Sequence, residues 1–468
     1  MTAALLIDFG STFTKLRAVD LEAAEIIGSG QGPSTVSTDV TEGLNAALKN
    51  LESRIGALPD FKHRLACSSA AGGLGMVTVG LVRELTAEAA KQAALGAGAK
   101  LTGAFSHGLT QADINAVEAL DPDIVLLAGG TDGGNADMII ENTQKLAASK
   151  VTCPVIAAGN RDAADAVRKI FEDAGKPVTV TENVMPEFGE LNVEPARAAI
   201  RQVFIDRIVH AKGIDRAAET FDAVLMPTPA AVLDAARLLS EGTGGQPGLG
   251  PLLVVDIGGA TTDVHSVASG EPTGEGVIAH GLPEPHLKRT VEGDLGMRLN
   301  VHAIAEAAGL ETLAEDAGLT PARAGEILDV VAGNVERLPG EGDGGEEEAR
   351  FDRALAAAAL KIAVTRHAGV LNVVQTVSGP VSVQTGKDLG RIETLIGTGG
   401  VLAHGQGAAD ILGSGLADAD EPQSLKPKNP ALLLDADYVL YAVGLLAAVV
   451  PEAALTFGLA HMHAVGEE

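Results

Sequence analysis

Two stretches of the chain share the same order of apolar and polar positions. The first, LLIDFGSTFTKLRAVD at positions 5–20, is an apolar run that stops at Asp8, passes through Gly-Ser-Thr and resumes as an alternation of polar and apolar residues. The second, PLLVVDIGGATTDVHSVASG at positions 251–270, repeats that order. Each stretch predicts two strands joined by a tight turn lined with hydroxyl groups, with an acid at its entrance.

The two stretches align at one constant separation, which indicates an internal duplication. Four pairs of residues fall into register 248 positions apart (256 − 8): Asp8 with Asp256, Gly10 with Gly258, Thr14 with Thr262, and Leu16 with Val264. The glycine-rich GTGGQPGLGP at 242–251 comes just before the second copy. It predicts a loop or hinge that enters a new lobe.

A different rhythm occupies the region between the copies. Short apolar runs in HRLACSSAAGG, DPDIVLLAGGTDGGN, VTCPVIAAGNRD and GKPVTVTENV alternate with Ala-, Glu- and Lys-rich stretches at 85–96 and 162–175. Strands that alternate with helices predict an open parallel sheet, so we place an inserted α/β unit at residues 61–200. Its loops at Ser68–Gly73, Gly129–Asn135 and Gly159–Asp162 are expected to cluster on one edge of that sheet.

After the second copy the pattern is mainly helical. Thr320-Pro321 predicts a helix start, with the helix running toward Arg337, and the apolar spacing of Phe351–Val374 predicts a longer helix. The acidic, glycine-rich Gly340–Glu348 is interpreted as a solvated loop rather than a metal site. The apolar stretch Tyr438–Val450 is shorter than the roughly 20 residues of a spanning helix and predicts a buried C-terminal helix.

Composition narrows the classes of partner. The chain has 468 residues with 46% hydrophobic and 21% charged positions, which is typical of a folded protein with more than one lobe. Lys and Arg number 34 against 62 Asp and Glu, and the net charge of −28 repels nucleic acid and anionic membranes. Two cysteines and the absence of a basic leader at the start of the sequence favour a cytoplasmic location.

The two acid-bearing turns are candidates for binding a nucleotide triphosphate with its metal ion. Asp8 and Asp256 are the expected metal-binding and catalytic carboxylates, because a carboxylate at a strand end can hold Mg²⁺ while neighbouring glycine amides hold phosphate oxygens. The further phosphate-binding candidates lie in the same turns: Gly10, Ser11, Thr12 and Lys15 in the first, and Gly258, Gly259, Thr261 and Thr262 in the second. A plain hairpin turn, in which Asp and Gly are common, is the alternative reading of either copy alone.

A third element lies in RIETLIGTGGVLAHGQG from Arg391. An apolar strand ends in Gly397-Thr398-Gly399-Gly400 and turns toward a helix, which brings the backbone close to a flat, bulky group. Adenine and ribose are the natural candidates for that group, although the same pattern also fits a simple strand-to-helix turn. In this chain the element follows both acid-bearing turns.

These three elements, in this order, resemble those of the actin, Hsp70 and sugar-kinase superfamily of ATPases. The resemblance implies two lobes built on ribonuclease-H-like sheets, with Asp8 and Asp256 facing one Mg-ATP across a cleft. The expected fold is therefore α/β, with the open parallel α/β domain inserted. The expected parts are a first lobe at 1–60, the insertion at 61–200, a continuation and hinge at 201–250, a second lobe at 251–425 and a helical segment at 426–468.

Several longer stretches resemble one family within that superfamily. SSAAGGLGMVTVGLVRELTAEAAKQAALGAGAK, IVLLAGGTDGGN, AGNRDAADAV and GLPEPHLKRTVEGDLGMR are similar to the MutL-type accessory proteins of glutamate (methylaspartate) mutase, which are not the mismatch-repair proteins of similar name. The resemblance implies ATP and Mg²⁺ as cofactors, adenosylcobalamin-dependent mutase subunits as partners, and a reactivase or chaperone role. A homodimer is one assembly that the sequence allows.

Two other functions fit the same fold. A small-molecule kinase would need an acceptor pocket and a base near the γ-phosphate, and Asp132 is the one further acid that stands out. An actin-like filament protein would assemble with ATP. The chain offers no good cobalamin ligand, because the D-x-H-x-x-G look-alike at 263–268 lacks the glycine, and His265 is expected to be a strand residue.

Overall fold

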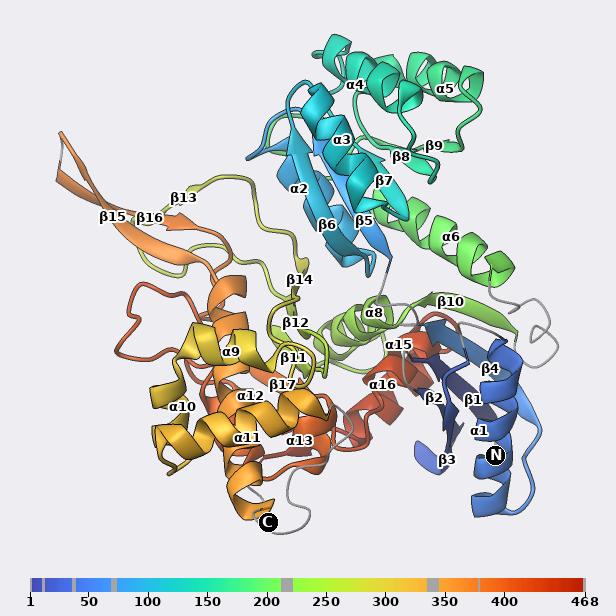
Figure 1. Ribbon diagram of the computed structural model, residues 1–468, viewed down its shortest axis with the longest axis vertical. Coiled ribbons are helices and arrows are strands. Elements are labelled where there is room, and N and C mark those ends of the chain that lie inside the picture. The colour runs from blue at the N-terminus through green and yellow to red at the C-terminus, as the bar shows by residue number, and fades with distance from the viewer. Residues whose placement is uncertain are drawn as a thin grey trace. The chain divides into compact units, whose positions relative to one another are not determined.

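The computed structural model describes residues 2–10, 13–35, 39–68, 74–211, 222–334, 345–377 and 379–465. The chain divides into two compact units. The first comprises Met1–Asp234, Gly281–Pro285 and Tyr441–Ala454, and the second comprises Ala235–His280, His286–Leu440 and Leu455–Glu468. Each unit is built around its own sheet, and the first also carries the inserted parallel sheet (Figure 1).

The sheet at the start of the first unit has the strand order β10-β4-β1-β2-β3. Its strands are β1 (Ala3–Phe9), β2 (Phe13–Asp20), β3 (Glu25–Pro33), β4 (Phe61–Ser68) and β10 (Ala223–Pro227). β1, β2 and β3 form an antiparallel meander, whereas β4 runs parallel to β1 and β10 runs parallel to β4. Every residue of β1 is buried, and α1 (Val40–Ile55) packs its apolar face on the same core.

The sheet of the second unit repeats this arrangement. Its order is β14-β12-β11-β17-β18-β19, formed by β11 (Leu252–Ile257), β12 (Thr262–Val267), β14 (Leu287–Glu292), β17 (Thr394–Thr398), β18 (Ala431–Leu434) and β19 (His463–Ala464). β11, β12 and β14 are antiparallel, and β17 and β18 are parallel to β11. The hairpin register is the same in both sheets, since Asp8 faces Lys15 and Asp256 faces Asp263. The predicted duplication is confirmed.

The inserted segment forms an entirely parallel sheet, as predicted. Its order is β6-β5-β7-β8-β9, with strands β5 (Gly75–Gly80), β6 (Lys100–Ser106), β7 (Ile124–Leu127), β8 (Val155–Ala157) and β9 (Val178–Val180). The accompanying helices are α2 (Thr86–Gly96), α3 (Gln111–Leu120), α4 (Asp137–Ala148), η1 (Arg161–Ala163), α5 (Ala164–Asp173) and α6 (Glu194–Ala211). This is a doubly wound order. The segment expected to start at residue 61 begins with β4, which lies in the first sheet beside β1.

Loops at the carboxyl ends of β7, β8 and β9 are joined by hydrogen bonds. The Asn183 amide donates to Gly130 O and to Asp132 Oδ1, both at 2.9 Å, and the Arg161 N–H donates to Asp132 Oδ1 at 3.0 Å. The Asn160 amide donates to Gly134 O at 3.2 Å. The loops Gly129–Asn135 and Gly159–Asp162 therefore lie together, as expected. Of the third loop, Ser68–Gly73, only Ser68 lies within the described residues.

The second unit adds helices and a small sheet. The helices are α9 (Val301–Ala308), α10 (Leu310–Asp316), α11 (Pro321–Gly333), α12 (Gly345–His367), α13 (Gly400–His404) and α14 (Ala408–Gly413), and the sheet is β13 (Ile278–His280), β16 (Gly379–Thr385) and β15 (Val370–Thr376). The Thr320 hydroxyl caps α11 by accepting from the Arg323 N–H, as predicted, whereas Arg337 lies outside the described residues. β15 and β16 form a long hairpin that extends beyond the helices of the unit (Figure 1).

Two expectations around α12 are wrong. The helix predicted for Phe351–Val374 ends at His367, and Val370 begins β15. Gly369 marks the change, because a Cβ there would lie 2.6 Å from the Gly386 carbonyl carbon, so the two backbones pass too closely for a helix with side chains. At the other end, the loop predicted to extend to Glu348 gives way to helix at Gly345, and Glu348 is buried in its first turn, where an acid is favourable.

The apolar stretch Tyr438–Val450 contains one buried helix, as predicted, and a second helix follows it. α15 (Leu440–Ala447) ends before Pro451, which is the first residue of α16 (Pro451–Ala460). Gly444 packs directly on α8 (Thr228–Glu241), because a Cβ on Gly444 would lie only 1.9 Å from the Ala231 carbonyl oxygen. Within the described ranges, none of the helices is long and apolar enough to cross a membrane.

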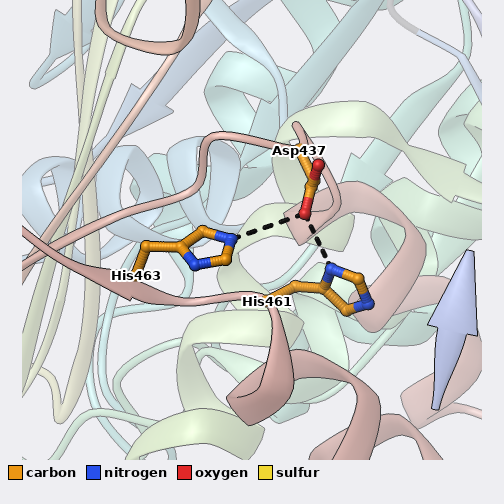
Figure 2. Close-up of side chains that lie close together, drawn as sticks. All are labelled: Asp437, His461 and His463. Carbon is orange, nitrogen blue, oxygen red and sulfur yellow. Dashed lines mark hydrogen bonds and ion pairs between the residues drawn. The ribbon is translucent and has the colours of Figure 1, made fainter. Parts of the chain in front are cut away.

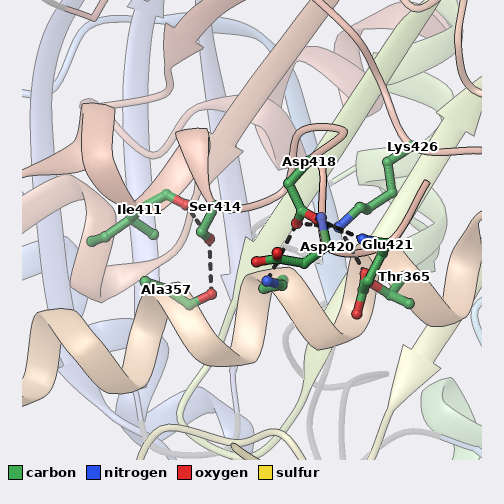
Figure 3. Close-up of polar contacts among 9 residues, drawn as sticks. Ala357, Thr365, Ile411, Ser414, Asp418, Asp420, Glu421 and Lys426 are labelled. Carbon is green, nitrogen blue, oxygen red and sulfur yellow. Dashed lines mark hydrogen bonds and ion pairs between the residues drawn. The ribbon is translucent and has the colours of Figure 1, made fainter. Parts of the chain in front are cut away.

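A buried lysine fixes the segment that follows α14. The fully buried Lys426 ammonium donates to Asp418 at 3.1 Å and to Glu421 at 2.9 Å (Figure 3). The same carboxylates contact α12, because Lys361 pairs with Asp418 at 3.3 Å and the Thr365 hydroxyl donates to Glu421 at 3.3 Å. Since the Lys426 charge is paired twice, its burial is compensated, and the pKa values of both acids lie below their usual range.

Candidate functional site

In the first unit, the carboxylate of Asp8 is held by residues from three elements. Asp8 lies near the end of β1 with 4% of its surface exposed. The Thr228 hydroxyl, at the start of α8, donates to Asp8 Oδ1 at 2.7 Å, and the Cys67 thiol of β4 donates to the same oxygen at 3.6 Å. Lys15 lies directly across the hairpin on β2. The pairing of β1 with β2 and β4 therefore places an ammonium group and a thiol beside this carboxylate, and the start of α8 adds a hydroxyl.

Burial dominates the electrostatics of this carboxylate. It raises the pKa of Asp8 above its usual value, while the Thr228 hydrogen bond, the Lys15 charge and the Cys67 hydrogen bond lower it by less. Burial and the neighbouring Asp8 charge raise the pKa of the Cys67 thiol well above its ordinary value, which makes Cys67 a neutral donor. An ionised Asp8 is therefore costly, and a cation beside it would offset that cost.

Gly10 and Gly258 each allow the backbone of their turn to close tightly. The Gly10 N–H donates to the Phe13 carbonyl at 3.0 Å, and the Gly258 N–H donates to the Thr261 carbonyl at 2.9 Å. A Cβ on Gly10 or on Gly258 would lie 2.6 or 2.8 Å from that same carbonyl oxygen, so neither turn accommodates a side chain. The candidates Ser11 and Thr12 lie outside the described residues.

The second turn differs in the charge opposite its acid. Asp256 is half-buried and faces Asp263, which occupies the position that Lys15 has in the first copy. Arg289 of β14 neutralises Asp263, with its Nη2 at 2.6 Å and its Nε at 2.8 Å from Oδ1. The Thr261 hydroxyl donates to Asp263 Oδ2 at 3.0 Å. The residue directly across the hairpin is therefore a cation in the first copy and an ion-paired acid in the second.

Two of the candidate threonines use their hydroxyl groups within the protein. Thr262 is fully buried and donates to the Leu295 carbonyl at 2.7 Å. Thr398 is buried at the end of β17 and donates to Asp435 Oδ2 at 2.9 Å. The side chain of Thr262 therefore stabilises the start of β12, and that of Thr398 stabilises the end of β17. Only the backbone of these two residues is left to contact a ligand.

The glycine-rich end of β17 lies against the second acid-bearing turn. Thr398 pairs with Asp256 in parallel register, and Gly399 has φ of 104°, with its Cβ position 2.3 Å from the Ile257 carbonyl oxygen. A Cβ on Gly397 would meet the side chains of Leu402 and Leu412, whereas one on Gly400 would meet nothing within 4 Å. Gly397 and Gly399 therefore serve packing, and Gly400 leaves exposed backbone at the start of α13.

The stretch EGDLGMR, at positions 292–298, is hydrogen-bonded to the glycines of the second acid-bearing turn. The Met297 N–H donates to the Gly258 carbonyl at 3.0 Å, and the N–H groups of Arg298 and Leu299 donate to the Gly259 carbonyl at 2.9 Å. Arg298 also forms a two-pronged ion pair with the buried Asp352 of α12, at 2.7 and 3.3 Å. The turn is thereby tied to the longest helix of its unit.

Sequence reasoning missed three residues of this arrangement: Cys67, Thr228 and Asp435. Cys67 and Thr398 occupy equivalent positions in the two sheets, because each pairs with the acid of its turn, Asp8 or Asp256. Thr228 and Asp435 are also equivalent, because each directly follows the next strand of its sheet, β10 or β18. Signals for two of them were present. Thr228-Pro229 is the same capping pair that marks Thr320-Pro321, and LLLD at 432–435 is an apolar run that stops at an acid, like LLID at 5–8.

His265 lies where it was predicted, in a strand. It is buried in β12, where burial and then the neighbouring Arg289 charge lower its pKa to about 3, against a smaller opposite effect of Asp263. His286 sits on the surface within 3.1 Å of Glu241, and His280 is exposed on β13. Their positions give these histidines no part in the acid-bearing turns.

The two sheets share the order of five strands and the register of their hairpins, and the second sheet adds β19 at its edge. With the parallel domain inserted into the first unit, they define the fold as that of the actin, Hsp70 and sugar-kinase type of ATPase. Within that class, the chain belongs to the MutL protein family, whose profile matches residues 4–461. "Protein MutL" of Clostridium tetanomorphum is 47% identical over 456 residues, covering 97% of this chain and 98% of that protein.

Solved structures that are similar to the chain are more distant. A nucleotide-free acetone carboxylase is 14% identical with a TM-score of 0.40, over 95% of this chain and 70% of that one. Xylulose kinase from Bifidobacterium adolescentis is 13% identical with a TM-score of 0.34, over 99% of this chain and 96% of that one.

Proposed function

We propose that this protein binds Mg-ATP and couples its hydrolysis to the reactivation or chaperoning of an adenosylcobalamin-dependent mutase of the glutamate mutase or aminomutase type. Membership of the MutL family supports the mutase as the partner. The main support for nucleotide binding is the repetition of the acid-bearing turn in both units, in the same sheet position and the same register. Both copies keep an acid and a glycine at the same positions of the turn, which supports a shared role for these residues.

The residues present fit ATP and magnesium. Asp8 and Asp256 provide hard oxygen ligands of the kind that Mg²⁺ prefers. The proposed phosphate contacts are Gly10, Ser11, Thr12, Lys15, Gly258, Gly259, Thr261 and the backbone of Thr262, and the proposed adenosine contacts are Gly397, Gly399, Gly400 and the backbone of Thr398. Gly259 is exposed, and a Cβ there would meet nothing closer than Arg298 at 3.8 Å, so its backbone is open to a ligand.

In this proposal both acids act on one nucleotide. Bound Mg-ATP supplies the γ-phosphoryl group that is transferred to water. Asp8, whose charge is costly in its buried position, would be stabilised by the cation and would orient it, while Lys15 would add a positive charge toward the phosphates. Asp256 takes the corresponding place in the second turn. Such positioning and charge stabilisation account for most of the catalysis in phosphoryl transfer.

Conformational work follows from the difference between ATP and ADP. Contacts that the γ-phosphate makes and ADP lacks can shift an equilibrium between two states of the protein only by their differential free energy. Radical enzymes that use adenosylcobalamin become trapped with damaged cofactor, and a partner that changes shape can release it. The clustered loops Gly129–Asn135 and Gly159–Asp162 of the inserted domain are the proposed contact with the mutase.

The decisive experiment is recovery of mutase activity. A mutase that co-purifies with this protein is inactivated by turnover and then incubated with the protein, Mg-ATP and fresh adenosylcobalamin. Recovery is expected with the wild type and with the matched control Asp60→Ala, an exposed acid, and is expected to be lost with Asp8→Asn and with Asp256→Asn. Full recovery with both Asn variants would overturn the roles of these acids. Phosphorylation of a small metabolite faster than ATP hydrolysis would favour a kinase instead.

A further inference from the structure

Three side chains with metal-binding groups converge in the second unit, in a place that the proposed ATPase chemistry does not use. They are Asp437, His461 and His463, and their ligand atoms all lie within 4.8 Å of one another. The His461 Nδ1 is 2.7 Å and the His463 Nε2 is 3.5 Å from Asp437 Oδ2 (Figure 2). Both imidazole rings are turned toward the same carboxylate oxygen (Figure 2).

Three separate pieces of backbone bring this set together. Asp437 lies in the turn after β18, where Tyr438 has a φ of 53° and its N–H donates to the Asp435 carbonyl at 3.3 Å. His461 follows the last residue of α16, and its ring lies 4.5 Å from the ring of Phe457, one helical turn earlier. His463 begins β19, which pairs with Leu434 of β18. The set is therefore positioned by a tight turn, a helix end and an edge strand.

The separations suit a small ion. Tetrahedral zinc with ligands at about 2.0–2.1 Å holds neighbouring ligand atoms about 3.3 Å apart. The two separations from Asp437 Oδ2, 2.7 and 3.5 Å, lie on either side of that value, so small movements of the side chains give the bound geometry. Two imidazoles and one carboxylate select a borderline transition-metal ion, because Mg²⁺ and Ca²⁺ prefer oxygen ligands alone.

We propose that Asp437, His461 and His463 form a zinc-binding site. Three protein ligands leave one position open for water or for a group from another molecule. The bound ion links β19 and the end of α16 to the turn after β18. That turn also contains Asp435, whose carboxylate accepts hydrogen bonds from Thr398 and from the Val439 N–H. Zinc thereby stabilises the part of the second unit that carries the glycine-rich end of β17, whether or not the protein hydrolyses ATP.

A single His–Asp pair elsewhere gives a matched control. His302 and Asp329 lie 4.0 Å apart on the surface of the same unit, with 61% and 81% of their side chains exposed. No third histidine, cysteine or acid joins this pair among the residues that the structure describes. Loss of His302 therefore removes a surface histidine with a neighbouring acid but leaves the proposed site intact.

The site is tested on tag-free full-length protein that has been stripped of metal. Titration with Co²⁺, followed by its visible absorption and by metal analysis after dialysis, measures the number of ions bound, and Zn²⁺ is then used to displace Co²⁺. We expect one ion per chain in the wild type and in His302→Ala. Asp437→Asn, His461→Gln and His463→Gln should each bind at least 10–100-fold more weakly, because even the loss of a residue that only supports a ligand has an effect of that size.

A second measurement separates loss of binding from loss of folding. His463 is half-exposed on a strand of two residues, so His463→Gln is expected to melt at the wild-type temperature in EDTA. Added Zn²⁺ should raise the melting temperature of the wild type and of His302→Ala, and leave that of His463→Gln unchanged. The proposal is overturned if the wild type binds no stoichiometric ion, or if the three ligand variants bind Co²⁺ as tightly as His302→Ala does.

Discussion

At the scale of single residues, Asp8 combines an unfavourable position with polar support. It is 4% exposed within an apolar sheet, and burial raises the pKa of its carboxyl. At pH values between the pKa of the unfolded chain, near 3.8, and the raised pKa of the folded chain, the folded chain holds this proton more tightly than the unfolded chain does. Stability is therefore lost as the pH rises through that window, and at neutral pH the charged Asp8 destabilises the fold. Residues that lower stability in this way are characteristic of functional sites.

Asp8→Asn tests this interpretation. Asparagine keeps an oxygen that accepts from Thr228 and Cys67 but carries no charge, so we expect a melting temperature equal to or above that of the wild type. Under the proposed function, Mg-ATP hydrolysis should fall about 100-fold or more. Thermal melts and a phosphate-release assay measure the two effects. A variant that melts several degrees lower and still hydrolyses ATP would assign Asp8 a structural role.

His265 provides a prediction about pH. Its pKa is about 3 in the folded chain, so between about pH 6.5 and pH 3 the unfolded chain binds a proton that the folded chain does not. Stability therefore falls as the pH is lowered, by about 1.4 kcal/mol between pH 7.5 and 5.5 for one such histidine. His265→Gln should weaken the pH dependence of the denaturant midpoint of the second unit. Glutamine at the exposed His302 is the control, and equal pH profiles for all three proteins would contradict the prediction.

The residues of the site were predictable from sequence to different degrees. Asp8, Gly10, Asp256 and Gly258 were identifiable because turn chemistry is local and occurs twice. The contribution of Cys67 was hidden, because only the parallel pairing of β4 with β1, nearly 60 residues apart in sequence, brings the thiol to Asp8. The hydroxyls of Thr262 and Thr398 looked available in the sequence, but folding commits them to Leu295 and Asp435.

At the scale of elements, the two hairpin turns should respond alike to the same substitution. In Gly10→Ala and in Gly258→Ala, the new Cβ would lie 2.6 or 2.8 Å from a carbonyl oxygen that the glycine N–H now contacts, so the turn must open. We expect each change to destabilise its unit by about 1–3 kcal/mol, as overpacking does elsewhere, and to weaken ATP binding. Thermal melts and calorimetric titration with Mg-ATP measure these effects.

Gly244→Ala is the matched control for the two turn variants. A Cβ on Gly244 meets nothing within 4 Å, and this residue lies in the exposed loop before β11. Its melting temperature and ATP affinity should equal those of the wild type. If Gly10→Ala and Gly258→Ala also behave like the wild type, the close approach of backbone in the turns has no energetic importance.

Element boundaries show where local sequence information ends. The apolar spacing of Phe351–Val374 predicts one helix, yet α12 ends at His367 and Val370–Thr376 forms a strand. Helical spacing and β-branched residues compete in that stretch, and the strand forms because β16 supplies a partner along its full length. The helix start at Thr320-Pro321 was predicted correctly because capping is a local interaction.

At the scale of the whole molecule, the duplication assigns one acid-bearing turn to each unit. The first turn carries Lys15 opposite its acid, and the second carries Asp263 neutralised by Arg289. The two copies therefore share the same hairpin register but differ in the charge of the residue opposite the acid. Two turns that act on one nucleotide must each lose affinity when either acid is removed, whereas two independent sites would not be coupled in this way.

Hydrogen exchange of the full-length protein distinguishes these cases. With Mg-ATP, we expect slower exchange at the β1–β2 turn of the first unit and at both the β11–β12 turn and the β17–α13 turn of the second, and EDTA should reverse all three. If both turns bind one nucleotide, as proposed, the loss of either acid weakens its binding. Protection should then also diminish at the two turns of the second unit in Asp8→Asn, and at the β1–β2 turn in Asp256→Asn. Asp60→Ala should keep the wild-type pattern. Protection that disappears only in the unit carrying the substitution would mean that each turn binds its own ligand, and the proposal of one shared Mg-ATP would then be wrong.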